Sequence, residues 1–598
     1  MDLRGPVYSA RPPRQTEARA TWSFRKILGA AQVTLRLPLL LMRKLARVEA
    51  QLTSGPAPVA DERAADTPRL RSAPNRATVV GAGILLSRIA GLVRESIFAH
   101  YLGNSAAADA FKAGFRIPNI LQNLFGEGVL SASFIPVYSR LLSEGNEEAA
   151  DLVAWAVGAI LAAAIAVLVL FGVIGAPWLI DAIAPGFRGD TRQLTIRIVQ
   201  VLFPGAGMLV MSAWCLGVLN SHHRFFASYA APVAWNLAII ATLLVYGPRA
   251  SQSRLAIDLA WGSVIGALLQ ILVQLPQTLP LLGRLQLHFE RVQSELKVVF
   301  NNLMPVIASR GAAQVSGYID NLLASLLPTG AVAAVNYAQI LYLLPISLFG
   351  MSVAAAELPT MSRATLSSTA GGVPATTAEI LRARLNAGLR QISFLVVPSA
   401  AAFLFIGDVI VALLFESGRF GHRDAIYVWS ILAGSAVGML AATMSRLYNS
   451  TYYALSDTRT PLRFALVRVT LTLALGYLGA IVLPPELGVA RRWGAVGLSA
   501  SAGIAAWIEF SLLRWKLNRR LGSTGLSRSY LLSLWGMALA ASIAALAVKF
   551  SLHAGPRLTA LAVIPIYGAV YLGLALWLRV PELTRLTGHA LGRFASRR

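Results

Sequence analysis

Seven charged side chains lie between residues 88 and 127, within two apolar stretches of the sequence. They are Arg88, Arg94, Glu95, Asp109, Lys112, Arg116 and Glu127. An ionised side chain that faces lipid at the centre of a membrane costs at least about 3 kcal/mol, so such residues face other helices or a water-filled cavity. Because the basic residues outnumber the acidic ones, the pattern favours an electropositive cavity. Arginine forks and a lysine would there bind an anionic, phosphate-bearing substrate.

The same residues are also compatible with a structural role. Arg88 and Glu95 are seven residues apart and share a helix face. A second set shares a face at spacings of three and four: Asp109, Lys112 and Arg116. Ion pairs within each set would lock neighbouring helices together. The sequence therefore leaves binding and structural roles open.

An isolated acid, Asp320, marks a second candidate site in a stretch predicted to span the membrane at residues 295–327. Asp320 could bind a cation together with backbone carbonyl groups. It could instead pair with Arg310, ten residues earlier, which lies on nearly the same helix face about 15 Å away along the axis. Coupling to sodium ions or protons is one expectation, and a structural ion pair is the other.

The sequence lacks the motifs on which hydrolysis would depend. It contains no Walker A sequence, nucleophile elbow or HExxH motif, so we do not expect an enzyme. His222 and His223 fall in a predicted loop where the pattern suggests no third metal ligand. The single cysteine, Cys215, excludes an intrachain disulfide. No resident cofactor is expected.

Membrane-spanning helices are the elements that must position these residues. Of 598 residues, 56% are hydrophobic and only 14% are charged, and the apolar blocks are long enough to cross a bilayer. The predicted fold is an all-α polytopic membrane protein with about fourteen spanning helices. The expected spans are 77–102, 108–142, 150–183, 191–220, 226–247, 255–282, 295–327, 330–364, 378–415, 424–453, 461–483, 488–516, 527–552 and 557–580.

The net charge of +25 does not indicate a nucleic acid partner, because the basic residues lie mostly between apolar blocks. Loops on the side of the N-terminus are the more basic ones, with Arg284, Arg291, Lys297, Arg382, Arg384, Arg459, Arg514, Lys516, Arg519 and Arg520. Both termini are basic as well. By the positive-inside rule, an even number of spans with both termini in the cytoplasm is predicted.

Residues 1–75 form a basic extension rich in Arg, Pro, Ala and Ser. Within it, residues 22–52 favour an amphipathic helix on the membrane surface, because Arg36 and Pro38 interrupt a short apolar run. Such a helix would contact anionic membrane lipids.

An internal repeat indicates two lobes. Ser87-Arg88 opens a segment that ends Ile135-Pro136-Val137-Tyr138-Ser139-Arg140, and Ser309-Arg310 opens one that ends Leu358-Pro359-Thr360-Met361-Ser362-Arg363. The copies start six spans apart and share one orientation, which implies two six-helix lobes with a site between them. The expected units are the extension 1–75, an N-lobe 76–286, a C-lobe 287–520, and 521–598 with two further helices and a basic tail.

The charged cluster sits within a set of short motifs. Near the start these are Ser87-Arg88-Ile89-Ala90-Gly91-Leu92-Val93-Arg94-Glu95, Ala108-Asp109-Ala110-Phe111, Phe115-Arg116-Ile117-Pro118-Asn119 and Phe125-Gly126-Glu127-Gly128. Two more are Asp320-Asn321-Leu322-Leu323-Ala324-Ser325-Leu326-Leu327-Pro328 and Asp457-Thr458-Arg459-Thr460-Pro461. Across residues 76–580 the chain thereby resembles the MurJ/MviN family of the MOP superfamily.

This resemblance implies a fourteen-helix flippase of the bacterial cytoplasmic membrane, expected to act as a monomer. Its substrate would be lipid II, the undecaprenyl-pyrophosphate-linked peptidoglycan precursor, moved to the outer leaflet by alternating access of two lobes. Arg88 and Arg94 match essential cavity arginines of the family, Asp109 a functional acid, and Asp320 a position linked to sodium in some members. The candidate substrate-binding residues are Arg88, Arg94, Asp109, Lys112 and Arg116.

The chain departs from the family pattern at two positions. Gln122 stands where the family often has arginine, and Ile340 stands where Tyr-Ala-Asp-Arg is typical. Losing two cationic partners weakens a pyrophosphate clamp unless Lys112, at a usually apolar position, compensates. Two alternatives to a lipid II flippase therefore stay open. One is an exporter of drugs or another polyprenyl-linked glycan, and the other is a non-transporting membrane scaffold.

Overall fold

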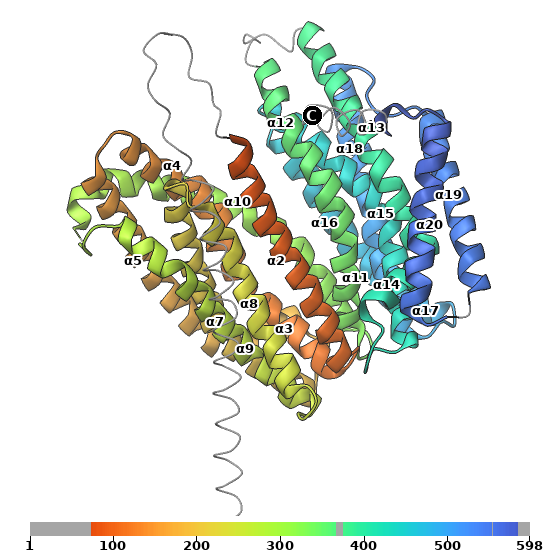
Figure 1. Ribbon diagram of the computed structural model, residues 1–598, viewed down its shortest axis with the longest axis horizontal. Helices are drawn as coiled ribbons and strands as arrows, with labels where there is room; N and C mark the ends of the chain where they lie inside the picture. Colours follow the sequence, from red (N-terminus) through yellow and green to blue (C-terminus); the bar gives the residue numbers. More distant parts are fainter. Residues whose placement is uncertain (1–72, 287, 366–374, 553, 584–598) are drawn as a thin grey trace, which may run out of the picture.

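The computed structural model describes residues 73–583 except 287, 366–374 and 553, and helices dominate this part of the chain (Figure 1). Apart from one isolated bridge between Ser417 and Phe420, the described residues contain no β-structure. The prediction of an all-α membrane fold is therefore confirmed. The predicted surface helix at residues 22–52 lies outside the described residues.

The helix boundaries follow the apolar blocks of the sequence. The first half contains α2 (Ala73–Leu102), α3 (Ala106–Phe125), α4 (Glu127–Ser143), α5 (Glu147–Ile174), α6 (Ala176–Ile183), α7 (Gly189–Ser221), α8 (Phe225–Tyr246), α9 (Gln252–Thr278) and α10 (Gln293–Ser325). The second half contains α11 (Ala331–Pro345), η3 (Ile346–Met351), α12 (Ser352–Thr365), α13 (Ala375–Phe405), α14 (Gly407–Phe415), α15 (His422–Ala454), α16 (Arg459–Tyr477), α17 (Leu483–Glu486), α18 (Gly494–Leu521), α19 (Arg528–Ser551) and α20 (Pro556–Trp577). Helical backbone is expected in these apolar segments because a spanning segment must satisfy its own backbone hydrogen-bonding groups.

Some predicted spans consist of two helices in succession. The span expected at 108–142 contains α3 and α4, which meet at Gly126. A Cβ on Gly126 would lie only 2.1 Å from the carbonyl oxygen of Gln122. Glycine therefore permits the tight change of direction between the two helices.

Twelve helical segments of the described chain are long and apolar enough to cross a membrane. Neither α2 nor α10 is among them, although α2 packs against α8, and α10 packs against α4 and α16. Both helices carry charged residues, such as Arg88 in α2 and Asp320 in α10. The chain is thus a multi-pass membrane protein, and the count of fourteen spans stays a prediction.

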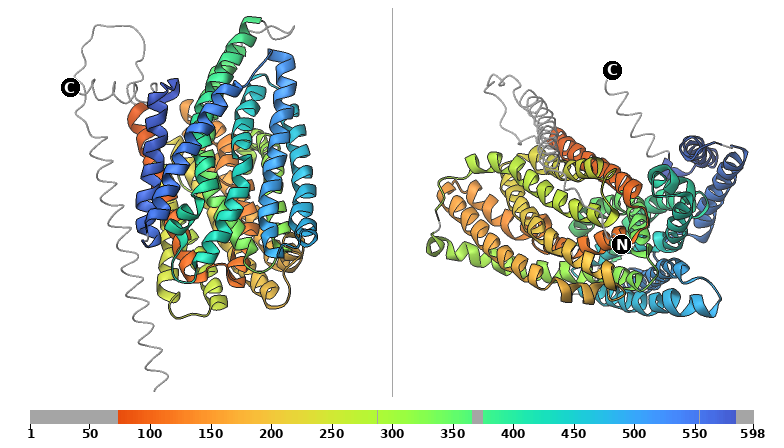
Figure 2. Two further views of the ribbon diagram at one scale, coloured as in Figure 1. Left: turned by 90° about the vertical axis from the view of Figure 1, so that its right-hand side faces the viewer. Right: turned by 90° about the horizontal axis from the view of Figure 1, so that it is seen from below.

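The helices form two groups that lie side by side (Figures 1 and 2). We call α2–α9 the N-terminal bundle and α11–α20 the C-terminal bundle; α10 contacts both. In the N-terminal bundle, α7 packs against α3, α5 and α9. In the C-terminal bundle, α15 packs against α11, α13 and α18, while α19 and α20 lie at the outer edge. The lobe boundaries near 286 and 520 stay a prediction.

Glycines let the central helices of the C-terminal bundle approach closely. A Cβ on Gly438 of α15 would lie 2.3 Å from the Cα of Gly503 of α18. Small residues at such crossings maximise van der Waals contact between membrane helices, where lipid removes the hydrophobic drive for association. Around this close contact, α11 packs against α15, and α10 and α16 pack against α18.

Candidate functional site

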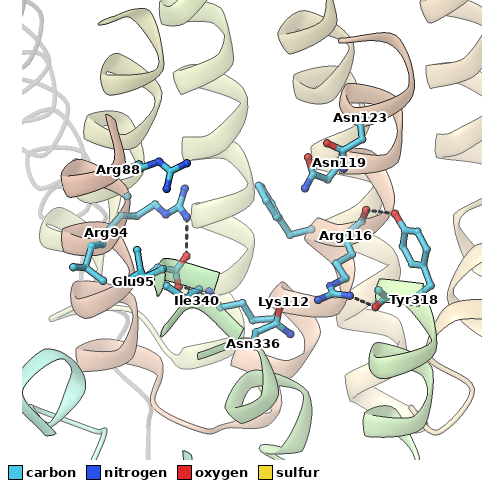
Figure 3. Close-up of a pocket in the computed structure, with 15 residues that line it drawn as sticks. Arg88, Arg94, Glu95, Lys112, Arg116, Asn119, Asn123, Tyr318, Asn336 and Ile340 are labelled. Carbon is cyan, nitrogen blue, oxygen red and sulfur yellow. Dashed lines mark hydrogen bonds and ion pairs between the residues drawn. The ribbon is translucent and has the colours of Figure 1, made fainter. Parts of the chain in front are cut away.

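A cavity of about 520 Å³ lies between the two bundles (Figure 3). Its lining comes from α2 and α3 on one side and from α10 and α11 on the other. Four of the five predicted binding residues line it: Arg88, Arg94, Lys112 and Arg116. The structure thus brings together side chains from two helices that the sequence could only place on separate spans.

Positive charge dominates this lining. Besides the four basic residues it contains one acid, Glu95, and several neutral polar groups, including Asn119, Asn123, Tyr318 and Asn336. Charges inside a protein interact more strongly than they do in water because the effective dielectric constant is lower. A cavity with this lining therefore suits an anion.

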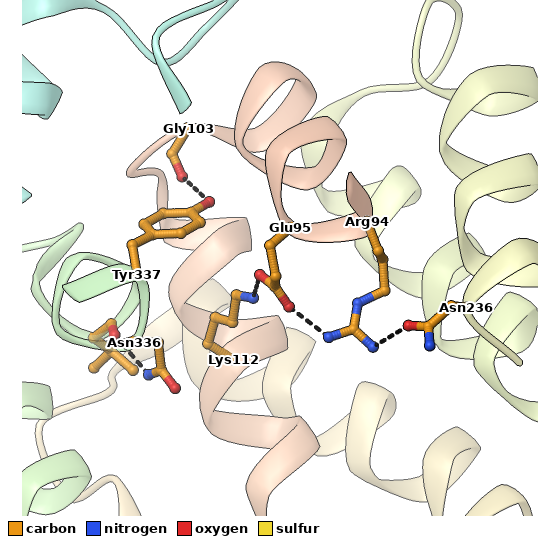
Figure 4. A network of polar contacts seen from close by, with 8 residues as sticks. Arg94, Glu95, Gly103, Lys112, Asn236, Asn336 and Tyr337 are labelled. Atoms are coloured by element: carbon orange, nitrogen blue, oxygen red, sulfur yellow. Dashed lines mark hydrogen bonds and ion pairs between the residues drawn. The ribbon is translucent and has the colours of Figure 1, made fainter. Parts of the chain in front are cut away.

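Glu95 joins two of the basic residues in a buried network (Figure 4). Nη2 of Arg94 lies 2.7 Å from Oε1 of Glu95, and the Lys112 ammonium group donates to Oε2. Nη1 of Arg94 donates to Oδ1 of Asn236 at 3.1 Å. Lys112 also lies 4.1 Å from the centroid of the Phe98 ring. The Glu95 carboxylate is thereby shared by two cations. Its single negative charge cannot neutralise both of them.

Arg88 makes a different contact. Its Nη1 donates to Oγ of Ser347 at 2.9 Å, across the gap to η3 of the C-terminal bundle, and its side chain is exposed. The pairing of Arg88 with Glu95, one of the two interpretations of the sequence, is not the arrangement the structure shows. With a neutral partner, Arg88 keeps its full charge for a ligand.

Arg116 links α3 to the opposite side of the cavity. Its Nη1 donates to the carbonyl oxygen of Gly317, and its Nη2 donates to Oε1 of Gln339 at 2.5 Å. The Tyr318 hydroxyl donates to the carbonyl oxygen of Arg116 at 3.3 Å. Arg116 therefore holds α3 against α10 and α11, and lines the cavity at the same time.

Asp109 does not line this cavity. It is buried near the start of α3 and accepts hydrogen bonds from the backbone N–H groups of Gly330 at 2.5 Å and Ala333 at 2.7 Å. Those N–H groups belong to the beginning of α11, where the helix leaves backbone donors unsatisfied and favours a negative charge. The carboxylate therefore joins the two bundles, and its hydrogen bonds go to α11 rather than to Lys112 or Arg116.

Further contacts close the bundles at this same end of α2. The Tyr337 hydroxyl donates to the carbonyl oxygen of Gly103 at 3.1 Å. Nδ1 of His100 and Oγ of Ser417 lie 3.0 Å apart, and the N–H of Arg419 donates to the carbonyl oxygen of His100 at 2.8 Å. We call this set of contacts, together with Asp109, the seal. It joins the α2–α3 turn to α11 and to the loop between α14 and α15.

The two positions that depart from the family pattern lie in different places. Ile340 lines the cavity between the bundles. Gln122 faces a much smaller space of about 20 Å³ between α3, α7 and α9, beside Phe115, Leu209 and Ser263. An arginine at position 340 would therefore enter the basic cavity, whereas one at position 122 would not.

Asp320 lies on a second cavity of about 270 Å³, between α10, α11, α15, α16 and α18. Its Oδ2 accepts a hydrogen bond from Nε2 of Gln339 at 3.1 Å, and Arg468 of α16 shares the lining. The side chain of Arg310, the alternative partner, is not among those the structure describes. Within the described residues no group of three or more His, Cys, Asp or Glu side chains could hold a metal ion.

Sequence reasoning missed an ion pair beside this second cavity. Nη1 of Arg468 lies 3.2 Å from Oε2 of Glu509, whose side chain is buried. Both residues fall inside predicted spans, at 461–483 and 488–516. The rule that singled out Asp320, an ionisable residue within a span, would have found them too.

Comparison with known proteins gives a consistent family. The model of the family described as lipid II flippase MurJ matches residues 98–564, beginning four residues after Arg94. A relative from Burkholderia cenocepacia named lipid II flippase MurJ is 32% identical over 443 residues, 73% of this chain and 82% of the relative. One from Rhizobium meliloti, named probable lipid II flippase MurJ, is 30% identical over 446 residues, 73% and 80% of the two chains.

Solved structures share the fold. A structure titled lipid II flippase MurJ, inward closed conformation, matches with a TM-score of 0.67 at 21% identity, over 84% of this chain and 99% of that one. An inward-facing multidrug resistance MATE transporter of the MOP superfamily matches with a TM-score of 0.58 at 15% identity, over 75% and 100%. The chain therefore shares its fold with both of these structures.

Proposed function

The chain belongs to the MurJ family, and we propose on this basis that it is a flippase that moves lipid II across the bacterial cytoplasmic membrane. Relatives with 30% identity or more over most of their length carry that name. The chain is accordingly a transporter in the synthesis of the cell wall.

The basic lining of the cavity between the bundles is the observation that carries this proposal. A pyrophosphate offers several anionic oxygens, and arginine forks bind such oxygens through charge-assisted hydrogen bonds. Arg88, which is exposed and donates to the neutral Ser347, would make the first contact. Arg94 would make the second contact. Because Lys112 also pairs with Glu95, the carboxylate holds the Arg94 guanidinium less strongly.

Transport by alternating access follows from the position of the seal. The seal joins the bundles at the end where α2 ends and α11 begins, while Arg88 lies about 18 Å further along α2 than His100. Substrate would enter from the Arg88 side, and release would require the contacts of Asp109 with α11 to break. We propose that the sealed end faces the outside of the cell and that both termini are cytoplasmic.

We propose that the working unit is a monomer, with lipid II and membrane lipids as its partners and no nucleic acid.

The apolar part of the cavity lining supports a second candidate function. Ile340, Leu92 and Leu344 line the cavity, and these apolar side chains favour amphipathic compounds as well as lipid-linked ones. An exporter of drugs or of another polyprenyl-linked glycan would use the same cavity.

Complementation tests the proposal directly. The chain is expressed in cells depleted of their own lipid II flippase, with growth, lipid II in the outer leaflet and the amount of folded protein measured together. Wild-type protein should restore growth. Arg88→Ala and Arg94→Ala should each reduce transport at least about tenfold, because charge-assisted hydrogen bonds of about 2 kcal/mol are lost. Arg→Lys should impair it less, since charge is kept and the fork is lost.

The amount of folded protein separates the outcomes. Normal lipid II transport by well-expressed Arg94→Ala protein would contradict the clamp. Failure of well-expressed wild-type protein to restore growth would favour the exporter or a scaffold without transport.

A further inference from the structure

The second cavity presents donors to Asp320 where a metal ion would need oxygen ligands. Nε2 of Gln339 donates to Oδ2 of Asp320 at 3.1 Å, and Oε1 of the same amide accepts from the guanidinium group of Arg116 at 2.5 Å. Arg116 and Arg468 both line the cavity. A hard cation is bound by carboxylate, carbonyl and hydroxyl oxygens. The groups that interact with this carboxylate are instead an amide N–H and two guanidinium groups, and the side chains of Tyr342, Ser435 and Ser499 complete the polar part of the lining.

The carboxylates around the cavity are already more than balanced by guanidinium groups of the protein itself. Asp320 and Glu509 are the carboxylates, and Arg468, Arg116 and Arg446 are the guanidinium groups. Arg468 pairs with Glu509 at 3.2 Å and interacts electrostatically with Asp320. A further cation would meet no unbalanced negative charge here. The residues present therefore do not fit the sodium site that was one expectation for Asp320.

We propose that Arg468 is the resident cation of the C-terminal bundle and takes the place of a bound alkali metal ion. Its guanidinium group pairs with the Glu509 carboxylate of α18 and interacts electrostatically with the Asp320 carboxylate of α10 across the cavity. The transport cycle, which this inference takes from the proposed function, consequently needs no sodium ion at Asp320. Arg468 is a positioning residue: it acts through Asp320 and Glu509 and does not touch the lipid substrate.

Two buried polar side chains, Thr472 and Asn321, lie close in sequence to Arg468 and Asp320, although neither lines the cavity. Thr472 lies one turn after Arg468 on α16, and its buried hydroxyl has no hydrogen-bond partner among the described residues. Asn321, next to Asp320 on α10, is buried with its amide in the same situation. Without the Arg468 guanidinium group, the two carboxylates would face only Arg116 and Arg446, so the excess of positive charge around Asp320 would be gone. Removing Arg468 should therefore allow a cation to bind at Asp320.

The test measures sodium binding to purified full-length protein in detergent. The apparent melting temperature is followed while NaCl replaces choline chloride at constant ionic strength. Wild-type protein and Arg468→Lys, which keeps the charge, should give the same melting temperature throughout. Arg468→Gln should gain a saturable rise with NaCl, and the further change Asp320→Asn should abolish that rise.

Opposite results overturn the inference. A saturable, sodium-specific rise in wild-type protein that Asp320→Asn removes would show that the ion binds with Arg468 present. If Arg468→Gln is recovered only in small amounts, Arg468→Met, which likewise removes the charge and keeps both carboxylates, is titrated in its place. No sodium response in either variant would show that Arg468 is only a structural partner of Glu509.

A transport measurement separates this inference from the proposed function. Complementation is repeated in medium in which potassium replaces sodium. Growth in both media is expected. Growth only with sodium would overturn the role of Arg468. Growth in neither medium would contradict the proposed function, and the role of Arg468 would then be decided by the sodium-binding measurement.

Discussion

Lys112 sets the charge that the cavity presents to a ligand. It donates to Glu95, and its ammonium group lies over the rings of Phe98 and Tyr337 at 4.1 and 5.4 Å. With an apolar residue at position 112, the Glu95 carboxylate would pair with Arg94 and not with Lys112. The lysine therefore frees part of the Arg94 guanidinium for an anion, although Lys112 is itself too buried to be the main contact.

We expect Lys112→Met to lower the amount of folded protein. The substitution leaves a buried carboxylate with one partner fewer, which costs about 3 kcal/mol when a buried pair is broken. Adding Glu95→Gln should recover most of this loss, because the unpaired charge disappears. Melting temperatures of the single and double variants give the coupling energy. Additive losses in the double variant would contradict the pairing.

Ile340→Arg should preserve or raise lipid II transport, because it adds a cation to the lining of the cavity. Gln122→Arg provides a matched comparison. Its side chain would enter a space of about 20 Å³, so we expect less folded protein and no gain in transport. Both variants are measured by complementation with expression level as the reference. Equal transport by the two variants would mean that an arginine need not line the basic cavity to affect transport.

At the residue level, the sequence could indicate which side chains matter but not which ones meet. Arg88, Arg94 and Arg116 are detectable because a charge within a span is costly. Their partners depend on how α2, α3, α10 and α11 pack. Glu95 could pair with several bases by spacing, and only the fold brings it to Lys112, seventeen residues away.

At the level of elements, the spans could be predicted because long apolar runs alternate with basic loops. The division of the expected span 378–415 into α13 and α14 could not. A Cβ on Gly407 would lie 2.6 Å from Cδ1 of Trp429, and Nε1 of Trp429 donates to the carbonyl oxygen of Phe403 at 3.0 Å. Contacts with α15 therefore end α13, and no pattern within the span reports them.

Asp109→Asn should weaken the seal. Asparagine keeps one acceptor oxygen but turns an N–H2 group toward a backbone N–H, and loss of a helix cap costs about 1 kcal/mol. The bundles would then separate more often at this end. Cross-linking with a short bifunctional reagent between cysteines at positions 100 and 417, in a Cys215→Ser background, measures the closed population. We expect a lower yield than in the parent.

Asp190→Asn is the control for this experiment. Asp190 lies in the first turn of α7, is exposed, and is not part of the seal. Its substitution should leave the cross-linking yield unchanged. An equal yield for Asp109→Asn would mean that other contacts, such as that of Tyr337 with Gly103, hold the bundles together without it.

For the molecule as a whole, the seal must be strong enough to close one end and weak enough to open. Individual hydrogen bonds contribute about 1 kcal/mol each, so the few contacts between α2, α3, α11 and the α14–α15 loop amount to a modest barrier. A substrate that binds the open and closed forms differently by a similar amount is sufficient to shift the balance. This whole-molecule property could not be predicted from the sequence, because the contacts join segments more than two hundred residues apart.

The sealed end is expected to face the outside of the cell. The α8–α9 loop lies at the sealed end, since a Cβ on Gly247 would lie 2.6 Å from Cδ1 of Tyr101. The loop after α9, with Arg284, lies one span further along the chain and hence on the other side. The positive-inside rule places the second of these in the cytoplasm. In a Cys215→Ser background, a cysteine at the exposed position 249 should react with a membrane-impermeant maleimide added to intact cells, and one at the exposed position 284 should react only after lysis. The reverse pattern would place the sealed end inside the cell and would require lipid II to enter from the outside, which is incompatible with transport to the outer leaflet.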